Sequence, residues 1–315
     1  MKKFLLRCFY FSIPIVVYAV IILLIDPFNY LNNTLLFTYE EKEQIASKFD
    51  PRYWKVIDYK YSKSNTIILG DSRSGFDMAY FKKKTGKNAY NFSLLAATLD
   101  EVIEGFWYIS KNNPNLEAAY IGINFNLYNK YNNKNLLSNA VQKNSLANYI
   151  FESVCYKVSY YLVSAKLSGK VEEIGKPTVS AAEFWKQQLD ADATKYYSLY
   201  KYPDNYYKKL GEIANYCIKN NIKLTFFSPP THIDLQQQIA TFSLEKENEQ
   251  FKSDIKSLAT FIDFEYANEL TSDKSNYGDP FHVKWEYRYK IIDGLIDLQD
   301  KYSMRYERTT FPKSK

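Results

Sequence analysis

Residues 66–74 of the chain are Thr-Ile-Ile-Leu-Gly-Asp-Ser-Arg-Ser, a short apolar run that passes directly into Gly70-Asp71-Ser72. An apolar, β-branched run of this length that ends at a glycine predicts a buried strand. Ser72 then lies at the carboxyl end of the strand, the edge at which open α/β sheets bind their ligands. A serine on such a tight turn exposes its hydroxyl, and its own N–H can face a developing oxyanion. The alternative is that Asp71 and Ser72 only cap the helix that follows.

Outward from this turn, strand-like and helix-like segments alternate along the chain. Alternation of this kind predicts an α/β fold, with a central parallel sheet covered by helices on both faces. The further strands are expected at 89–92, 118–123, 222–227 and 261–264, and the helices at 99–111, 203–220, 233–258 and 285–302.

The sequence predicts four parts. A cytoplasmic stub and transmembrane anchor (1–28) is followed by a polar connector (29–63). A catalytic domain (64–302) carries a mainly helical insertion at about 126–203, with helices at 146–167 and 181–189. We expect the insertion to cap or flank the sheet, and a basic tail (303–315) to be loosely held.

The N-terminal segment predicts a membrane anchor. Lys2, Lys3 and Arg7 precede an uncharged run from Cys8 to Ile25, and a helix that crosses a bilayer needs roughly 17–25 apolar residues. No small-x-small pair of a signal-peptide cleavage site stands before Asp26-Pro27. The positive charges place the N-terminus in the cytoplasm and the remainder of the chain outside it. The prediction is a single-pass protein of the cell membrane.

Composition narrows the function. The formal net charge is +6, with 41 Lys and Arg against 35 Asp and Glu, and no basic helix or nucleic-acid motif accompanies it, so no nucleic-acid partner is expected. With two histidines, ten glycines and no ligand spacing or phosphate-binding loop, we expect no metal and no cofactor. Three cysteines allow at most one disulfide outside the anchor, between Cys155 and Cys217.

A second motif lies near the other end of the catalytic domain, where Asp279-Pro280-Phe281-His282 precedes the last helix. An Asp three residues before a His can hold the far nitrogen of the imidazole, which leaves the near nitrogen to take the proton of a serine. The sequence therefore predicts Ser72 as nucleophile, His282 as base and Asp279 as orienting acid. A capping Asp beside an incidental surface His is the alternative.

These two motifs resemble the first and last motif blocks of the SGNH (GDSL-like) hydrolase superfamily, and the likeness extends over about residues 64–128 and 203–300. The resemblance implies a flavodoxin-like three-layer sandwich. More closely, the chain looks like membrane-anchored SGNH proteins of cell-envelope modification, among them alginate-type polysaccharide O-acetyltransferase partners and D-alanyl transfer proteins of teichoic acid synthesis. The segments "DPFNY", "GDSRSGFD", "YNFSLLAATLDE", "YIGINFNLYN", "IKLTFFSPPTHIDL" and "YGDPFHV" carry this likeness.

The resemblance also implies an oxyanion hole. The amide of Ser72 provides one donor, and the second block of the family provides a glycine N–H where this chain has Ala96 or Ala97. The third block provides an Asn in a Gly-x-Asn context, which Gly122-x-Asn124 fits, with Asn126 as a second candidate.

Four residues near the expected active edge are candidates for substrate binding: Arg73, Asn91, Asn126 and His232. Arg73 could bind an anionic group or form a local salt bridge. His232 follows the fourth strand, where it could contact substrate, act as an alternate base or hold a loop beside a helix N-cap.

Together these features predict an extracytoplasmic serine esterase or O-acyltransferase that works through an acyl-serine. The expected substrate is a cell-envelope or exported polysaccharide. The resemblance implies a membrane-bound O-acyltransferase as the partner that supplies acyl groups. The alternative is a non-catalytic protein of the same fold that binds a polysaccharide or organises a synthase. The many tyrosines and the unmatched middle segment support this alternative.

Overall fold

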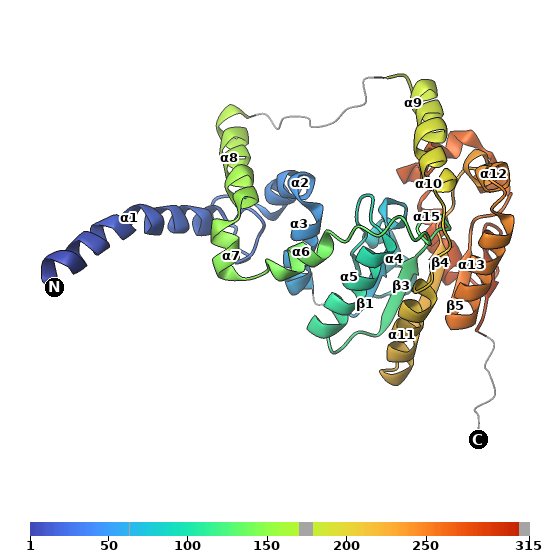
Figure 1. Cartoon of the computed structure of the whole chain (residues 1–315), viewed down its shortest axis with the longest axis horizontal. Helices are drawn as coiled ribbons and strands as arrows, with labels where there is room; N and C mark the ends of the chain where they lie inside the picture. The colour runs from blue at the N-terminus through green and yellow to red at the C-terminus, as the bar shows by residue number, and fades with distance from the viewer. Residues whose placement is uncertain (63, 170–178, 309–315) are drawn as a thin grey trace. The chain divides into compact units, whose positions relative to one another are not determined.

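The computed structural model of the chain describes residues 1–62, 64–169 and 179–308 (Figure 1). The chain divides into two units. Unit 1 comprises residues 1–63 and 136–176, and unit 2 comprises residues 64–135 and 177–315.

Unit 2 is built on a six-stranded sheet in the order β2-β1-β3-β4-β5-β8. All neighbouring pairs are parallel except β5 and β8, which are antiparallel. A separate hairpin consists of β6 and β7. The strands are β1 (Thr66–Leu69), β2 (Ala89–Asn91), β3 (Ala118–Gly122), β4 (Lys223–Ser228), β5 (Thr260–Asp263), β6 (Tyr277–Asp279), β7 (His282–Val283) and β8 (Met304–Tyr306).

Helices lie on both faces of this sheet. The helices of unit 2 are α4 (Met78–Thr85), α5 (Leu99–Asn112), α9 (Ala181–Gln187), α10 (Thr194–Ser198), α11 (Tyr206–Lys219), α12 (Ile233–Thr241), α13 (Glu245–Leu258), α14 (Glu269–Ser272) and α15 (Tyr289–Ile296). Ile68 of β1 packs in one cluster with Phe81 of α4 and Ile292 of α15. Its neighbour Leu69 points to the opposite face, where α5 approaches closely at Gly105. The prediction of a mixed α/β fold with a central, mostly parallel sheet is confirmed.

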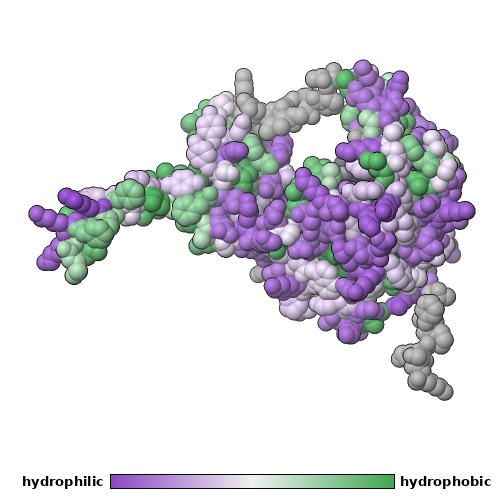
Figure 2. Space-filling model, in the orientation of Figure 1, coloured by the Kyte–Doolittle hydropathy of each residue, from purple (hydrophilic) through white to green (hydrophobic). Residues whose placement is uncertain are grey.

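Unit 1 is helical. It contains α1 (Lys2–Ile25), α2 (Tyr39–Phe49), α3 (Pro51–Ser62), α6 (Leu137–Gln142), α7 (Leu146–Phe151) and α8 (Ser153–Ser168). By its length and composition α1 could cross a membrane, and Pro14 does not interrupt it. Its side chains are mostly exposed up to Val20 (Figure 2).

Several segments differ from expectation. The stretch expected as a connector forms α2 and α3, since Thr38 and Glu41 make a capping box and both helices bury an apolar face. The helix expected at 233–258 is two helices, because Ser243 takes a left-handed conformation with φ 55°. The helix expected at 146–167 is broken at Glu152, whose backbone is extended.

Other differences concern the end of the chain and the insertion. The expected last helix, 285–302, is a 3₁₀ turn followed by α15, which ends at Ile296. Residues 304–306 of the expected tail form the edge strand β8, while 309–315 lie outside the described residues. The expected insertion at 126–203 is divided, with residues 136–176 in unit 1 and residues 126–135 and 177–203 in unit 2. Cys155 and Cys217 are buried free thiols.

Candidate active site

The turn after β1 carries Ser72. Gly70 has φ 148°, in the region that favours glycine, and Ser72–Ser74 forms one 3₁₀ turn. A Cβ at Gly70 or at Gly122 of β3 would lie 2.2 or 2.1 Å from the Ser74 hydroxyl oxygen. Both glycines therefore let the turn sit between the ends of β1 and β3, where the order of the strands reverses.

The hairpin of β6 and β7 brings His282 to this serine. The His282 Nε2 atom lies 2.7 Å from the Ser72 Oγ, and its Nδ1 lies 2.8 Å from Asp279 Oδ2. Asp279 Oδ1 also accepts the backbone N–H groups of Phe281 and His282, at 2.8 and 3.1 Å. Because an ionised carboxylate only accepts hydrogen bonds, Nδ1 carries the proton, and the lone pair of Nε2 faces the serine hydroxyl. The three residues have the geometry of a nucleophile, a base and an orienting acid.

Arg288, just before α15, connects the two parts of this arrangement. Its Nη1 donates to the carbonyl oxygens of Gly75 (2.7 Å) and Ser72 (3.4 Å), and its Nε donates to that of Val283 (3.1 Å). Burial lowers the pKa of this guanidinium. One side chain thus holds the serine turn against the histidine strand, a contact that no sequence motif indicated.

A cavity of about 220 Å³ opens at the Ser72–His282 pair, and Ala96 lines it. Ala96 has φ 47°, a left-handed conformation that favours glycine, which explains why a glycine would suit this position. Among the described hydrogen bonds, neither the Ser72 nor the Ala96 backbone N–H donates to the protein. Both backbone N–H groups stay candidate oxyanion donors.

The structure places Asn126, and not Asn124, in this cavity. The Asn124 Nδ2 donates to the carbonyl oxygen of Pro229 at 2.7 Å, so Asn126 is the better placed of the two candidate oxyanion donors. Asn126 Oδ1 accepts from Arg73 Nη1 at 3.0 Å, and this bond leaves the NH₂ of the amide as the end that can donate to a ligand.

Arg73 is committed within the protein. Its Nε donates to both oxygens of Asp71, at 3.1 and 2.9 Å, its Nη2 forms an ion pair with Asp71, and its Nη1 holds Asn126. Burial alone would lower the pKa of Arg73, but the charge and hydrogen bonds of Asp71, together with the charge of Glu265, outweigh it and raise the pKa. Of the two roles weighed for Arg73, the local salt bridge is the one formed. The Arg73 side chain therefore holds Asn126 in position and does not bind an anionic substrate.

Asn91 and His232 also have structural roles. The Asn91 side chain donates to the Ser74 carbonyl oxygen (3.3 Å) and accepts from the Ser93 N–H (2.8 Å), outside the lining of the cavity. The His232 Nδ1 accepts the Asp234 N–H at 3.1 Å and caps α12, and its backbone N–H donates to Pro280. His232 therefore holds the loop between Asp279 and His282 through the Pro280 carbonyl oxygen, and it does not line the cavity at Ser72.

Several residues of the cavity were not predicted from the sequence. Gln188 and Tyr196 come from the segment of the expected insertion that belongs to unit 2, and Gln188 begins a π-helical turn, a feature that is frequent at functional sites. Tyr196 packs edge-on against Phe281, which also lines the cavity. No residue pattern in 177–203 indicated these contacts, since they depend on how the segment folds over the sheet edge.

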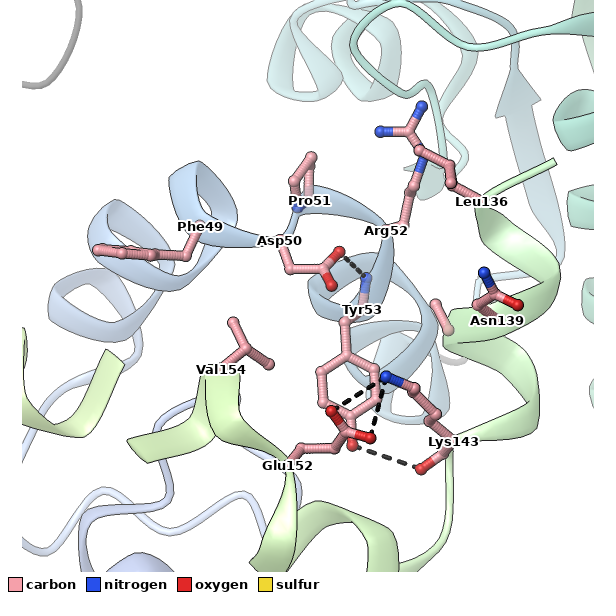
Figure 3. Close-up of a pocket in the computed structure, with 11 residues that line it drawn as sticks. Phe49, Asp50, Pro51, Arg52, Tyr53, Leu136, Asn139, Lys143, Glu152 and Val154 are labelled. Carbon is pink, nitrogen blue, oxygen red and sulfur yellow. Dashed lines mark hydrogen bonds and ion pairs between the residues drawn. The ribbon is translucent and has the colours of Figure 1, made fainter. Parts of the chain in front are cut away.

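A second cavity, of about 360 Å³, lies within unit 1 (Figure 3). Two of its charged groups pair with each other, Lys143 with Glu152 at 3.0 Å, while Asp50 Oδ1 accepts the backbone N–H of Tyr53 at 2.9 Å. It contains no nucleophile with an adjacent base, so we take the cavity at Ser72 as the candidate active site. Within the described ranges, no group of His, Cys, Asp or Glu residues is arranged to hold a metal ion.

Comparison with known proteins assigns no family. No model of a known protein family matches the chain, and no curated protein matches it. Among solved structures, a Streptococcus pneumonia protein provisionally described as a platelet activating factor matches at 12% identity, over 82% of this chain and 92% of its own. The TM-score is 0.38, at which the likeness supports no conclusion about fold or activity.

Proposed function

We propose that the protein is a membrane-anchored serine esterase or O-acyltransferase of the SGNH type. The observation that carries the proposal is the contact of Ser72 Oγ with His282 Nε2 at 2.7 Å, together with that of His282 Nδ1 with Asp279 at 2.8 Å. The parallel strand order 2-1-3-4-5, with the serine at the switch point, is the order of flavodoxin-like folds and supports the proposal.

In the proposed reaction, Ser72 Oγ attacks the carbonyl carbon of an ester while its proton passes to His282 Nε2. The carbonyl oxygen becomes an oxyanion, which accepts hydrogen bonds from the N–H groups of Ser72 and Ala96 and from the Asn126 amide. Collapse breaks the bond to the alcohol oxygen, which takes the proton from His282 and leaves an acyl-Ser72.

The second half of the reaction transfers the acyl group from Ser72. Water or a sugar hydroxyl attacks the acyl carbon, gives its proton to His282, and Ser72 leaves with that proton. The acceptor in our proposal is a cell-envelope or exported polysaccharide, and a membrane-bound O-acyltransferase supplies the acyl groups. A helix able to span a membrane supports this location, with the N-terminus in the cytoplasm by the positive-inside rule.

Covalent labelling of the detergent-solubilised full chain with a fluorophosphonate, read by intact mass, tests the proposal. We expect one adduct in the wild type and none in Ser72→Ala. The matched control is Ser74→Ala, which removes a buried hydroxyl two residues away and keeps the adduct. A folded wild type that takes up no label would overturn the catalytic assignment and favour the polysaccharide-binding alternative.

A further inference from the structure

Helix α8 presents an apolar and aromatic stripe to solvent. Tyr156, Tyr160, Val163 and Leu167 are spaced by four, three and four residues, so they lie along one face of the helix. All four are exposed, Tyr160 to 62% and Leu167 to 84%. Phe151, at the end of α7, is exposed to 63%. A contiguous stripe of this kind on a soluble domain marks an interaction surface.

A different face of α8 is already occupied within unit 1. Cys155, Val158 and Leu162 are buried, and α8 packs against α2. The residues of α8 include two lysines, Lys157 and Lys166, and no acidic residue. An apolar stripe beside lysines, without a carboxylate, is the composition of helices that lie on anionic membranes.

The anchor helix α1 contacts the other helices of unit 1 at this place. Phe151 stacks on Tyr18 of α1, with ring centroids 6.3 Å apart. Tyr149 of α7 donates its hydroxyl proton to Asp26 Oδ1 at 2.8 Å, directly after the end of α1. Helix α1 contacts both α7 and α8. The corner between α7 and α8 is therefore fixed to the last two turns of α1.

The length of α1 sets the depth of this corner. At about 1.5 Å per residue, the uncharged run from Cys8 to Ile25 spans about 27 Å. The hydrocarbon layer is about 30 Å thick, so a crossing helix needs the whole run. Tyr18 lies about 12 Å from Asp26 along the helix by the same rise, so it lies in the hydrocarbon half-layer from which α1 emerges. Phe151, which stacks on Tyr18, therefore reaches into the same half-layer.

The direction of α8 fits this location. In Figure 1, α8 runs across the end of α1 and not alongside it, and α1 leaves unit 1 on the side of α8 away from α2. A helix transverse to a membrane span lies in the plane of the membrane. Figure 2 shows green and pale surface over α1 and α8.

We propose that α8, together with Phe151, is an interfacial helix that lies on the lipid surface of the leaflet from which α1 emerges. The proposal rests on the anchoring part of the proposed function. The exposed Tyr156 and Tyr160 match the aromatic belt of membrane proteins, and the exposed Lys157 can reach anionic headgroups. Lys166 is held within unit 1 by the Leu36 carbonyl oxygen and Glu41. The bilayer then holds unit 1 at a second point besides α1.

Fluorescence quenching in proteoliposomes tests the proposal. The full chain, in a Cys8→Ser background, is labelled with an environment-sensitive fluorophore at Tyr160→Cys or Leu167→Cys and reconstituted into phosphatidylcholine–phosphatidylglycerol vesicles. The buried Cys155 and Cys217 remain in place. Leu199→Cys is the matched control, since Leu199 is an exposed leucine (60%) of unit 2. Val16→Cys reports on the anchor itself.

We expect brominated lipid to quench the label at 160 and 167, and aqueous iodide to quench the label at 199. Quenching at 160 and 167 by iodide alone, with position 16 quenched by lipid, would overturn the interfacial helix and leave the anchor standing. Protection of 160 and 167 from both quenchers would assign the stripe to a protein partner and also overturn the proposal. A label at 16 that iodide quenches would contradict the anchor, and with it the membrane part of the proposed function.

Discussion

The β6–β7 hairpin and the loop after β4 each present a histidine with an aspartate nearby, and the two histidines differ in what their Nδ1 atoms do. The Nδ1 of His282 donates to Asp279, so the lone pair is on Nε2, 2.7 Å from Ser72 Oγ. The Nδ1 of His232 accepts the Asp234 N–H, so its lone pair is used by the helix cap, and Nε2 is buried. The bond made by Nδ1, and not the nearby Asp alone, decides which histidine can be a base.

The largest expected effect separates these two histidines. His282→Ala removes the base, and we expect the rate of fluorophosphonate labelling to fall by about 10⁴–10⁶, as for members of such triads. His232→Ala leaves the base and the serine in place, and we expect the labelling rate of folded protein to stay within about tenfold of the wild type. If both variants are folded and lose the labelling rate equally, the assignment of His282 as the base and His232 as a structural residue is wrong.

Asn124 and Asn126 give a second contrast of the same kind. Asn126→Ala removes a donor at the oxyanion position, and we expect ester turnover to fall by about 10²–10³ with little change in KM. Asn124→Ala leaves the carbonyl oxygen of Pro229 without its donor, so we expect a stability loss of about 1–3 kcal/mol and near-normal turnover. Steady-state kinetics and thermal melts of both variants decide between them. The reverse pattern would restore Asn124 to the oxyanion hole.

Arg288 tests whether the two halves of the site need a physical link. Arg288→Met removes the three hydrogen bonds by which Arg288 links the serine turn to the histidine strand, and we expect about 10–100-fold slower acylation at saturating probe. Arg288→Lys keeps one cation and should recover part of the rate. A melting temperature alone would report only packing, so the maximal acylation rate is the measurement. An unchanged rate in the Met variant contradicts a positioning role.

Much of the sheet could be predicted from sequence because its signals are local. The strands β1 to β5 are short apolar runs bounded by turns, and all five lie within about one residue of their expected positions. The Asp279-x-x-His282 geometry also depends on a few adjacent residues. Such features can be predicted because the residues that determine them are adjacent in the sequence.

The remaining features depend on contacts that a sequence pattern does not carry. Asn124 and Asn126 are two residues apart, and only the path of the chain after Gly122 decides which faces the cavity. The break at Ser243 lies inside a continuous helical pattern and needs a left-handed residue that is not glycine. Residues 29–63 look polar and unstructured, yet α2 and α3 bury one face each within unit 1.

A smaller effect concerns the stability of the region around His232. Burial lowers the pKa of His232, opposed by Asp234 and Asp273 and assisted by Lys274, and Trp185 and Tyr277 pack on the ring. The folded state therefore favours the neutral ring. Its contribution is present above the unfolded pKa of about 6.5 and is lost as the pH falls below it, with a slope of at most about 1.4 kcal/mol per pH unit.

The variant His232→Asn isolates this effect, since asparagine keeps an N-cap acceptor but does not titrate. We expect denaturant midpoints measured between pH 7.5 and pH 5 to fall less in the variant than in the wild type. The raised pKa of the buried Glu265 acts in both proteins and cancels in the difference. Parallel pH profiles would show that His232 carries no such linkage.

The smallest expected effect concerns the second oxyanion donor, Ala96. A left-handed alanine destabilises the folded state by about 1–2 kcal/mol. Glycine relieves this strain, but its larger unfolded-state entropy offsets about 0.5–1 kcal/mol of the gain. Ala96→Gly should therefore stabilise the protein by up to about 1 kcal/mol and keep the labelling rate, because the backbone N–H stays in place. Ala97→Gly is the matched control: Ala97 is buried and has no left-handed backbone, so it should lose about 0.5–1 kcal/mol. Destabilisation by Ala96→Gly equal to that of Ala97→Gly would mean that the loop after β2 does not hold Ala96 in a strained left-handed conformation.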